Sequence, residues 1–453
     1  MAMMPPLVFI HGIKGSILRD SKGRLRWLNF LQAIGATTPV AAPLSWRCPN
    51  STDADRHHAP QIVQRIEPLR STGHHNPFVA FRRYLAWDAF AAANGMSAPQ
   101  REALTLELDG LVAGVAGTGF TTTPFLRADA LSDALGFTAD GGVWVKDETH
   151  HVAGSHKARH LFGILLHLVA AERCGVTPWS PATRPPLAIA SCGNAAIAAS
   201  TLAAAVQWPI RVFVPESASD VVVAKLNTLG ATVVECPRLA SDPPGDPCVH
   251  RFREAVRGGA VPFSVQGTEN AWCLDGGRTI GWEMARHFEE SVEGPPLDRV
   301  FVQVGGGAFA ASVAAGFRMS GVSPRLHAVQ TSACAPLDRA WELARHMGGP
   351  AVAAHHWDDC MWPWEVVGNT AADGILDDET YDWLPVVGAM ADSNGSPVVV
   401  QESDVLRANE LARATTGIDA SHTGTAGLAG LLAARAHVAD DERVAVVLSG
   451  VRR

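Results

Sequence analysis

The chain has 453 residues, 47% of them apolar and 18% charged, a composition typical of globular proteins that bury a large core. Its net charge of −8 at pH 7 argues against nucleic acid or an anionic membrane surface as a partner. The apolar runs are too short to span a bilayer, no secretory signal begins the chain, and the eight cysteines form no C-x-x-C pair. We therefore expect a cytoplasmic enzyme with reduced thiols.

The first 76 residues are expected to form an extension outside the main body. Within it, PLVFIHGIKGSILRD (Pro6–Asp20) resembles the first strand and oxyanion turn of lecithin-cholesterol-acyltransferase-like hydrolases. Such a hydrolase needs a serine with glycine two positions before and after it, and no serine of the chain has both. We interpret the segment as a strand and a glycine turn, and residues 40–78 as a loop-rich connector. An α/β-hydrolase-related protein is the weaker alternative.

The main body shows alternating strand and helix patterns. Helical spacing predicts helices over residues 77–94 and 101–111. Downstream, β-branched runs predict strands at residues 142–145, 187–190, 210–214, 232–235, 299–304, 325–329 and 444–448. Stretches rich in alanine and leucine predict helices at residues 156–174, 194–205, 218–229, 278–290, 308–319 and 424–439. This alternation predicts an α/β fold with mostly parallel sheets covered by helices on both faces.

Four loops that follow predicted strands carry residues suited to one ligand. Lys157 lies near a helix start, where a charged lysine is unfavourable and a neutral or imine-forming one is better tolerated. Gly305–Gly307 open another helix, whose free N–H groups suit a phosphate. SCGN (Ser191–Asn194) opens a third helix, and Ser449 follows the last strand. Because such loops meet at one edge of a parallel sheet, they predict a site for a phosphate-bearing aldehyde.

In this order, K-x-E…GSHKAR, S-x-G-N, G-G-G and a terminal Ser-Gly resemble the pyridoxal-phosphate enzymes of fold type II, the tryptophan synthase β type. The segment Thr121–Arg159, with TTTPF and WVKDE, is most similar to threonine synthase and serine/threonine dehydratase members. The resemblance covers roughly residues 77–453 and implies two three-layer αβα subdomains with the cofactor in the cleft between them. Residues 77–187 and 262–453 would form the large cofactor-binding domain, and residues 188–261 a smaller mobile subdomain.

The resemblance also implies a role for each site residue. Lys157 would form the internal aldimine and transfer the Cα proton, and Ser449 would meet the pyridine nitrogen. Asn194 would bond the 3′-oxygen of pyridoxal 5′-phosphate. The phosphate would lie on Gly305, Gly306 and Gly307, and the substrate carboxylate on Ser191, Cys192, Gly193 and Asn194.

The implied activity is that of a lyase or synthase on a small α-amino acid, by β- or γ-elimination or replacement. A neutral hydroxyl at Ser449 leaves the pyridine nitrogen largely unprotonated, which favours loss of a leaving group over transamination. Dehydratases, ammonia-lyases and threonine- or cysteine-synthase-like enzymes all fit this description. Relatives are usually dimers, so a homodimer is expected. A catalytically silent protein that binds pyridoxal phosphate is the main alternative.

The chain departs from the family pattern near the lysine. His156 stands where many relatives carry an aromatic residue, and Cys192 stands where serine or glycine is more frequent. The glycine run has three members where several relatives have four, and Asp419–Leu431 aligns only loosely with the substrate-side segment.

Histidines crowd two regions of the chain. Four of them lie around Lys157, but none forms a zincin-type pair with a flanking carboxylate, so no metal site is expected there. The tryptophan-rich stretch His355–Glu365 is interpreted as a packed loop, with a substrate lid as the alternative.

Overall fold

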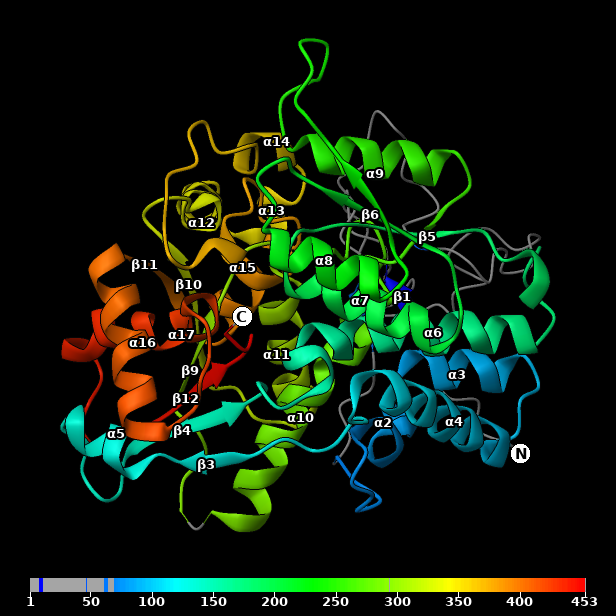
Figure 1. Cartoon of the computed structure of the whole chain (residues 1–453). Coiled ribbons are helices and arrows are strands. Elements are labelled where there is room, and N and C mark those ends of the chain that lie inside the picture. The colour runs from blue at the N-terminus through cyan, green and yellow to red at the C-terminus, as the bar shows by residue number, and fades with distance from the viewer. Residues whose placement is uncertain (1–7, 11–45, 47–60, 64–68, 293, 453) are drawn as a thin grey trace, which may run out of the picture.

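A computed structural model describes residues 8–10, 46, 61–63, 69–292 and 294–452. Its main body contains a six-stranded and a four-stranded sheet, each with helices on both faces (Figure 1). The larger sheet has the order β11–β10–β9–β12–β4–β3, and every pair is parallel except β3 with β4. Its strands are β3 (Phe125–Arg127), β4 (Gly142–Asp147), β9 (Arg299–Gln303), β10 (Arg325–Thr331), β11 (Ser396–Val400) and β12 (Arg443–Leu448).

The central strands of the larger sheet are apolar throughout because both faces are covered. On β12, Val444, Val446 and Leu448 enter the core on one face, whereas Ala445 and Val447 enter the core on the other. The first face is covered by α5 (Asp129–Ala134), α16 (Glu402–Thr416) and α17 (His422–Ala434). The second face is covered by α10 (Cys273–Ser291), α11 (Ala308–Met319), α12 (Pro336–His346) and α15 (Trp383–Asp392).

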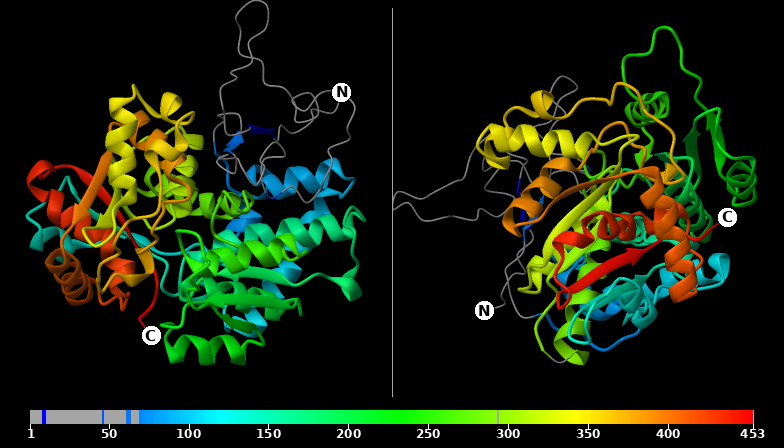
Figure 2. Two further views of the ribbon diagram at one scale, coloured as in Figure 1. Left: turned by 90° about the horizontal axis from the view of Figure 1, so that it is seen from above. Right: turned by 90° about the vertical axis from the view of Figure 1, so that its left-hand side faces the viewer.

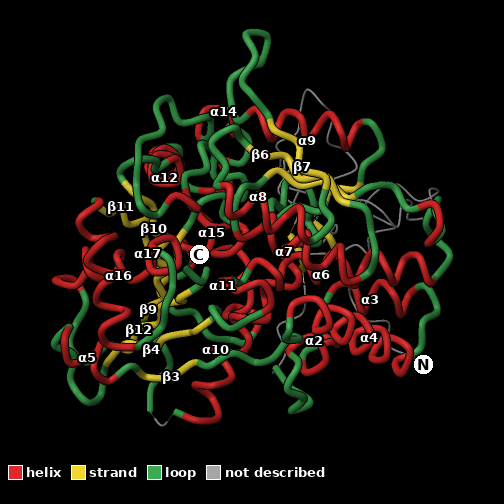
Figure 3. The backbone as a smooth tube through the Cα atoms, viewed as in Figure 1, coloured by secondary structure: helices red, strands yellow, loops and turns green. Residues whose placement is uncertain are grey.

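The four-stranded sheet is entirely parallel, in the order β7–β6–β5–β8. Its strands are β5 (Leu187–Ala190), β6 (Ile210–Val214), β7 (Thr232–Glu235) and β8 (Val261–Pro262). Helix α9 (Pro247–Arg257) covers one face, through Phe252 against Ala188 and Phe213. Helices α7 (Asn194–Ala205) and α8 (Asp220–Thr228) cover the other, and α7 packs on α6 (Lys157–Arg173) (Figure 3).

The helix predicted over residues 77–94 is broken into α2 (Pro77–Ala80), a 3-10 turn (Arg82–Tyr84) and α3 (Ala86–Ala93). Leu85, before α3, has an extended backbone with φ −84° and ψ 138°. The buried carboxylate of Asp275 accepts the backbone N–H groups of Ala86 and Trp87 at 2.7 and 3.2 Å. A distant carboxylate therefore starts a second helix where local spacing predicted a continuous one.

Residues 101–111 lie inside a longer helix, α4 (Ala98–Ala116), which begins at a capping box formed by Ser97 and Gln100. Two further short helices, α13 (Pro350–Ala353) and α14 (Trp357–Cys360), follow α12. Trp357 stacks edge-on against Trp383, so this part of the tryptophan-rich stretch is packed.

In the N-terminal region, β1 (Val8–Ile10) pairs with β2 (Gln61–Val63) in a separate antiparallel sheet. The predicted glycine turn within Pro6–Asp20 and most of the connector at residues 40–78 lie outside the described residues. The seven described cysteines are free thiols. No helix in the described part of the chain is both long and apolar enough to cross a membrane.

The end of the chain returns to the region where the two sheets meet (Figure 2). After β12, the Val451 N–H donates to the Gly154 carbonyl at 2.9 Å, three residues before α6 begins. The loops after β4 and β12 are thus adjacent, as expected for neighbouring parallel strands.

Candidate active site

The loops that follow β4, β5, β9 and β12 converge, and they carry Lys157, Asn194, the glycine turn 305–307 and Ser449. Lys157 interacts electrostatically with Asp377, whose carboxylate lies against Gly305. His156, next to Lys157, is hydrogen-bonded to Ser449. A Cβ on Gly450 would lie 2.7 Å from Asn194 Nδ2. The structure therefore brings the predicted cofactor residues into one region.

Lys157 is the first residue of α6 and is half-buried. The chain enters the helix through Ala153 and Gly154, which both have positive φ, 57° and 71°. Burial lowers the pKa of the Lys157 amine, while Asp377 acts in the opposite direction. An amine with a lowered pKa is a better nucleophile near neutral pH than an ordinary lysine.

A buried charge network lies beneath the start of α6. Arg159 donates to Glu148 at 2.8 Å and to Glu283 at 2.5 Å, and Lys146 forms an ion pair with Glu283. All four side chains are almost completely buried. Although burial lowers it, the pKa of Arg159 is raised by Glu148 and Glu283, so its charge is retained. The network links β4 and α6 to α10. It therefore fixes the orientation of the start of α6, where Lys157 lies.

Sequence reasoning missed the part of this network on α10. Glu283 and Thr279, which accepts from Arg159 at 3.0 Å, lie 120 or more residues beyond it in the chain. The only sequence signal for this part of the network was Glu283 on the apolar side of the helix predicted at residues 278–290.

The glycine turn has the geometry of an anion site. Gly307 has φ +95° and precedes the first residue of the twelve-residue helix α11. A Cβ on Gly306 would lie 3.2 Å from the Tyr381 ring, and one on Gly305 would overlap with Asp377 Oδ2. The Gly306 N–H stabilises the charged form of the Asp377 carboxylate. The turn thus already holds an anionic group, as a phosphate site would.

Two carboxylates from the loop before α15 approach Lys157. Burial raises the pKa of Asp377 to about 6 and that of Asp382 to about 7, with Lys157 opposing both shifts. Asp382 accepts the Gly267 N–H at 2.8 Å, and its own N–H donates to the Gly306 carbonyl at 2.8 Å. Neither residue was among those predicted, because only the path of this loop brings it to the glycine turn.

Ser449 and His156 form a buried pair. Ser449 Oγ lies 3.0 Å from the His156 backbone nitrogen and 2.5 Å from its Nδ1. The His156 ring stacks on Phe309 of α11, with centroids 3.9 Å apart and an interplanar angle of 17°. His156 thus combines an aromatic stack with a hydrogen bond to Ser449.

The segment Ser191–Asn194 leads into α7. Ser191 Oγ accepts the Gly193 N–H at 3.3 Å, and Gly193 is the residue before the helix. The pKa of the Cys192 thiol is raised by desolvation and then by Asp373 and Asp246. This loop therefore faces the acidic segment that includes Asp377.

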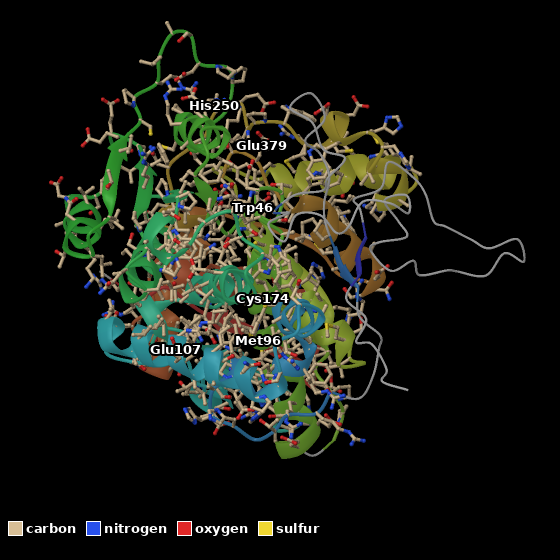
Figure 4. The ribbon with its side chains drawn as sticks, turned by 90° about the vertical axis from the view of Figure 1, so that its right-hand side faces the viewer. Trp46, Met96, Glu107, Cys174, His250 and Glu379 are labelled. Atoms are coloured by element: carbon tan, nitrogen blue, oxygen red, sulfur yellow. The ribbon has the colours of Figure 1, made fainter. Side chains whose placement is uncertain are left out.

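The acidic segment comprises Asp373, Asp377, Asp378 and Glu379 and precedes α15. Burial raises the pKa of Glu379 to about 7, and Arg253 of α9 acts against the shift. Figure 4 shows Glu379 beside the helix that carries His250. Glu379 thus lies near enough to the four-stranded side to feel the charge of Arg253.

These residues suit an aldehyde that carries a phosphate. A half-buried amine can attack the carbonyl carbon, and a glycine turn that already holds a carboxylate can hold an anion. The Ser449 hydroxyl and the Asn194 amide lie in the same region and can form hydrogen bonds with polar atoms of an aromatic ring.

Comparisons with known proteins identify the family of the chain. A family model described as pyridoxal-phosphate dependent enzyme matches residues 117–450. A curated relative from Rattus norvegicus, named serine dehydratase-like, is 28% identical over 288 residues, which cover 59% of this chain and 79% of the relative. Its counterpart from Mus musculus is 28% identical over 287 residues with the same coverage.

Solved structures show the same fold. Threonine deaminase isoform 2 from Solanum lycopersicum matches with a TM-score of 0.58 and 18% identity, over 80% of this chain and 92% of the other. Serine racemase from Dictyostelium discoideum matches with a TM-score of 0.57 and 18% identity, over 77% of this chain and 98% of the other. The predicted fold class, with two αβα units and mostly parallel sheets, is confirmed.

Proposed function

Because the chain belongs to the family of pyridoxal-phosphate-dependent enzymes, we propose that it catalyses β-elimination on a small α-amino acid, as a dehydratase or ammonia-lyase does. The observation that carries the proposal is the Lys157 amine, whose pKa burial lowers, beside a glycine turn that holds an anion. The relatives named serine dehydratase-like support a hydroxy amino acid as substrate.

Each predicted cofactor residue would make a specific contact with pyridoxal phosphate. Lys157 would bear pyridoxal phosphate on Nζ, and the N–H groups of Gly305–Gly307 and the start of α11 would hold its phosphate. Asn194 would donate to the ring oxygen, and Ser449 would meet the ring nitrogen. When bound, pyridoxal phosphate supplies an electron sink that stabilises negative charge at Cα.

Once the substrate amine has replaced Nζ on the cofactor, Lys157 would be free to transfer the protons of the reaction. A neutral amine can accept the Cα proton whereas an ammonium group cannot, and the lowered pKa increases the neutral fraction near pH 7. Nζ can then deliver the proton to the β-hydroxyl, which leaves as water. The buried network of Arg159, Glu148 and Glu283 would keep Nζ in place during both transfers.

The substrate carboxylate would bind at the start of α7. The first N–H groups of a helix have no partner within the helix and favour an anion. Ser191, Cys192, Gly193 and Asn194 supply this end of the twelve-residue helix α7. Because the acidic segment lies opposite, the carboxylate would be drawn to α7 and repelled from Asp373 and Asp377.

We also propose that residues 188–261 move as a unit and close on the substrate. Support comes from their separate four-stranded sheet, whose outer face has its own core around Phe213 and Phe252. A homodimer and a cytoplasmic location are proposed from the resemblance to the family. Light scattering of the purified protein tests the first of these.

The deciding experiment compares wild-type protein with Lys157→Ala and with Lys225→Ala, which removes an exposed lysine of α8. We expect wild type and Lys225→Ala to bind pyridoxal phosphate with a visible band, and borohydride to fix the cofactor on the peptide that contains Lys157. A panel that includes L-serine and L-threonine is then scanned for release of a 2-oxo acid and ammonia.

Three outcomes separate the alternatives. A 2-oxo acid from one amino acid supports the lyase. Product only in the presence of a second nucleophile would make the protein a synthase. A bound cofactor with no spectral response to any amino acid would leave a silent binder, and the absence of any band would overturn the cofactor assignment.

A further inference from the structure

The bond between His156 and Ser449 limits what the serine hydroxyl can do. The oxygen of a serine hydroxyl has two lone pairs and one proton. The His156 backbone N–H donates to Ser449 Oγ at 3.0 Å and takes up one lone pair. The ring atom Nδ1 lies 2.5 Å from the same oxygen, so its proton state decides whether the second lone pair is also taken.

The surroundings of the imidazole favour a proton on Nδ1. The other ring nitrogen, Nε2, is buried and has no hydrogen-bond partner among the described residues. An N–H at that position would lose its bond to water without replacement, and buried N–H groups without a partner are rarer in proteins than buried acceptors without one. A proton on Nδ1 instead donates to Ser449 Oγ, so the hydrogen-bond network assigns this tautomer.

The ring is also held neutral. Burial lowers the pKa of His156 well below its ordinary value, and Lys157, His160, Arg159 and His151 act in the same direction. A second proton on the imidazole is therefore strongly disfavoured.

The position of the ring is fixed by packing. It stacks on Phe309, the second residue of α11, with an interplanar angle of 17°. The nearby His160 ring meets it edge-on at 5.8 Å and is itself anchored by its Nδ1 at 2.8 Å from the Cys273 carbonyl oxygen. Nδ1 of His156 is thus aimed at Ser449 by a rigid set of contacts.

We propose that His156 is a positioning residue that fills both lone pairs of Ser449 Oγ and leaves the hydroxyl able only to donate. A hydroxyl restricted in this way would donate to the pyridine nitrogen of the cofactor in its unprotonated form and could not accept a hydrogen bond from the pyridinium form. This inference rests on the proposed function, because it concerns the same site. It assigns to a histidine the control of ring protonation that a neutral serine alone leaves open, since an unrestricted serine hydroxyl can also accept a hydrogen bond from a protonated ring nitrogen.

Two substitutions separate hydrogen bonding from stacking. His156→Phe keeps the stack on Phe309 and removes the Nδ1 donor, whereas His156→Asn keeps a donor near the Nδ1 position and removes the stack. Each variant and the wild type are loaded with pyridoxal phosphate labelled with ¹⁵N in the ring. The ¹⁵N chemical shift, followed from pH 6 to pH 9, reports protonation of the ring nitrogen directly.

We expect the wild type and His156→Asn to keep an unprotonated ring nitrogen. In His156→Phe one lone pair of Ser449 becomes free, so the protonated fraction at a given pH should rise roughly 3- to 10-fold, the value of one hydrogen bond. In a Ser449→Ala background, His156→Phe should cause no further change, because the histidine acts through the serine. His156→Leu serves as a second donor-free variant if the phenylalanine variant does not fold.

The results distinguish this inference from the function on which it rests. If the wild type binds no cofactor, the proposed function fails and the inference fails with it. If His156→Phe binds cofactor normally with an unchanged ¹⁵N shift, the inference alone is overturned. Equal changes in the asparagine and phenylalanine variants would likewise overturn it, because the Nδ1 donor, which only the phenylalanine variant lacks, would then not account for the effect.

Discussion

The carboxylate of Asp377 lies against Gly305 so closely that a Cβ on the glycine would overlap with Asp377 Oδ2. The contact joins a loop that precedes β10 in the chain to one that follows it. It places an acid in the turn that is expected to hold a phosphate. Asp377 also acts on Lys157, so one carboxylate serves the amine and the turn together.

Replacing Asp377 with asparagine is expected to tighten the binding of pyridoxal phosphate about tenfold at pH 8, because a charged acceptor no longer competes for the Gly306 N–H. The pKa of Asp377 is raised to about 6, so the advantage of the variant should shrink as the pH falls below that value and the wild-type acid becomes neutral. Fluorescence titration at pH 5.5 and pH 8 measures it. Asp378→Asn, at the neighbouring carboxylate, is the control, and an equal effect there would contradict the prediction.

Gly305→Ala should weaken cofactor binding about tenfold and lower the melting temperature. The new Cβ forces Asp377 or the turn to move, and such overpacking costs about 1–3 kcal/mol. Gly388→Ala is the matched control, since a Cβ there, on α15, meets no atom within 4 Å. Cofactor affinity and thermal unfolding are measured for both. Wild-type cofactor affinity in Gly305→Ala would contradict the prediction, because Asp377 and the turn would then make room for the Cβ at no cost to cofactor binding.

Asp382→Asn should stabilise the protein more at pH 8 than at pH 5. Burial raises the pKa of Asp382 from 3.8 to about 7, so the folded chain binds more protons than the unfolded chain between these values. The wild type therefore loses stability from this group as the pH rises through that window, and the variant does not. The difference should reach a few kcal/mol at most. Melting temperatures of the wild type and Asp382→Asn are measured across this pH range, with Asp133→Asn, at an exposed position, as the control. A constant difference between the wild type and Asp382→Asn would refute the prediction.

Glu283→Ala should destabilise the chain by about 3–5 kcal/mol, because it leaves the charge of Lys146 buried without its ion-pair partner and leaves Arg159 with Glu148 alone. Glu290→Ala removes a glutamate from the same helix, where its ion pair with Arg286 is half exposed, and should cost less than about 1 kcal/mol. Urea unfolding of the two variants tests the contrast. Similar losses would mean that the buried network contributes no more than a surface pair.

Much of the fold could be predicted from local patterns. The strands at residues 187–190, 210–214 and 232–235 and the helices at 194–205 and 308–319 were predicted with the bounds that the structure has. Their apolar runs are bounded by glycine, proline or polar residues, so the local signal and the tertiary environment agree. The short strands β3 and β8 were missed, because two or three residues carry too little periodicity to be recognised.

The sequence by itself determined the βα alternation and the order of Lys157, SCGN, the glycine turn and Ser449, because periodicity and motif order are properties of neighbouring residues. Only the tertiary structure decided that Asp377 and Asp382 approach Lys157, that Glu283 completes the network of Arg159, and that His156 bonds Ser449. The last contact spans 293 positions in the chain. Such contacts depend on how helices and loops pack at the sheet edges, and no local spacing encodes that.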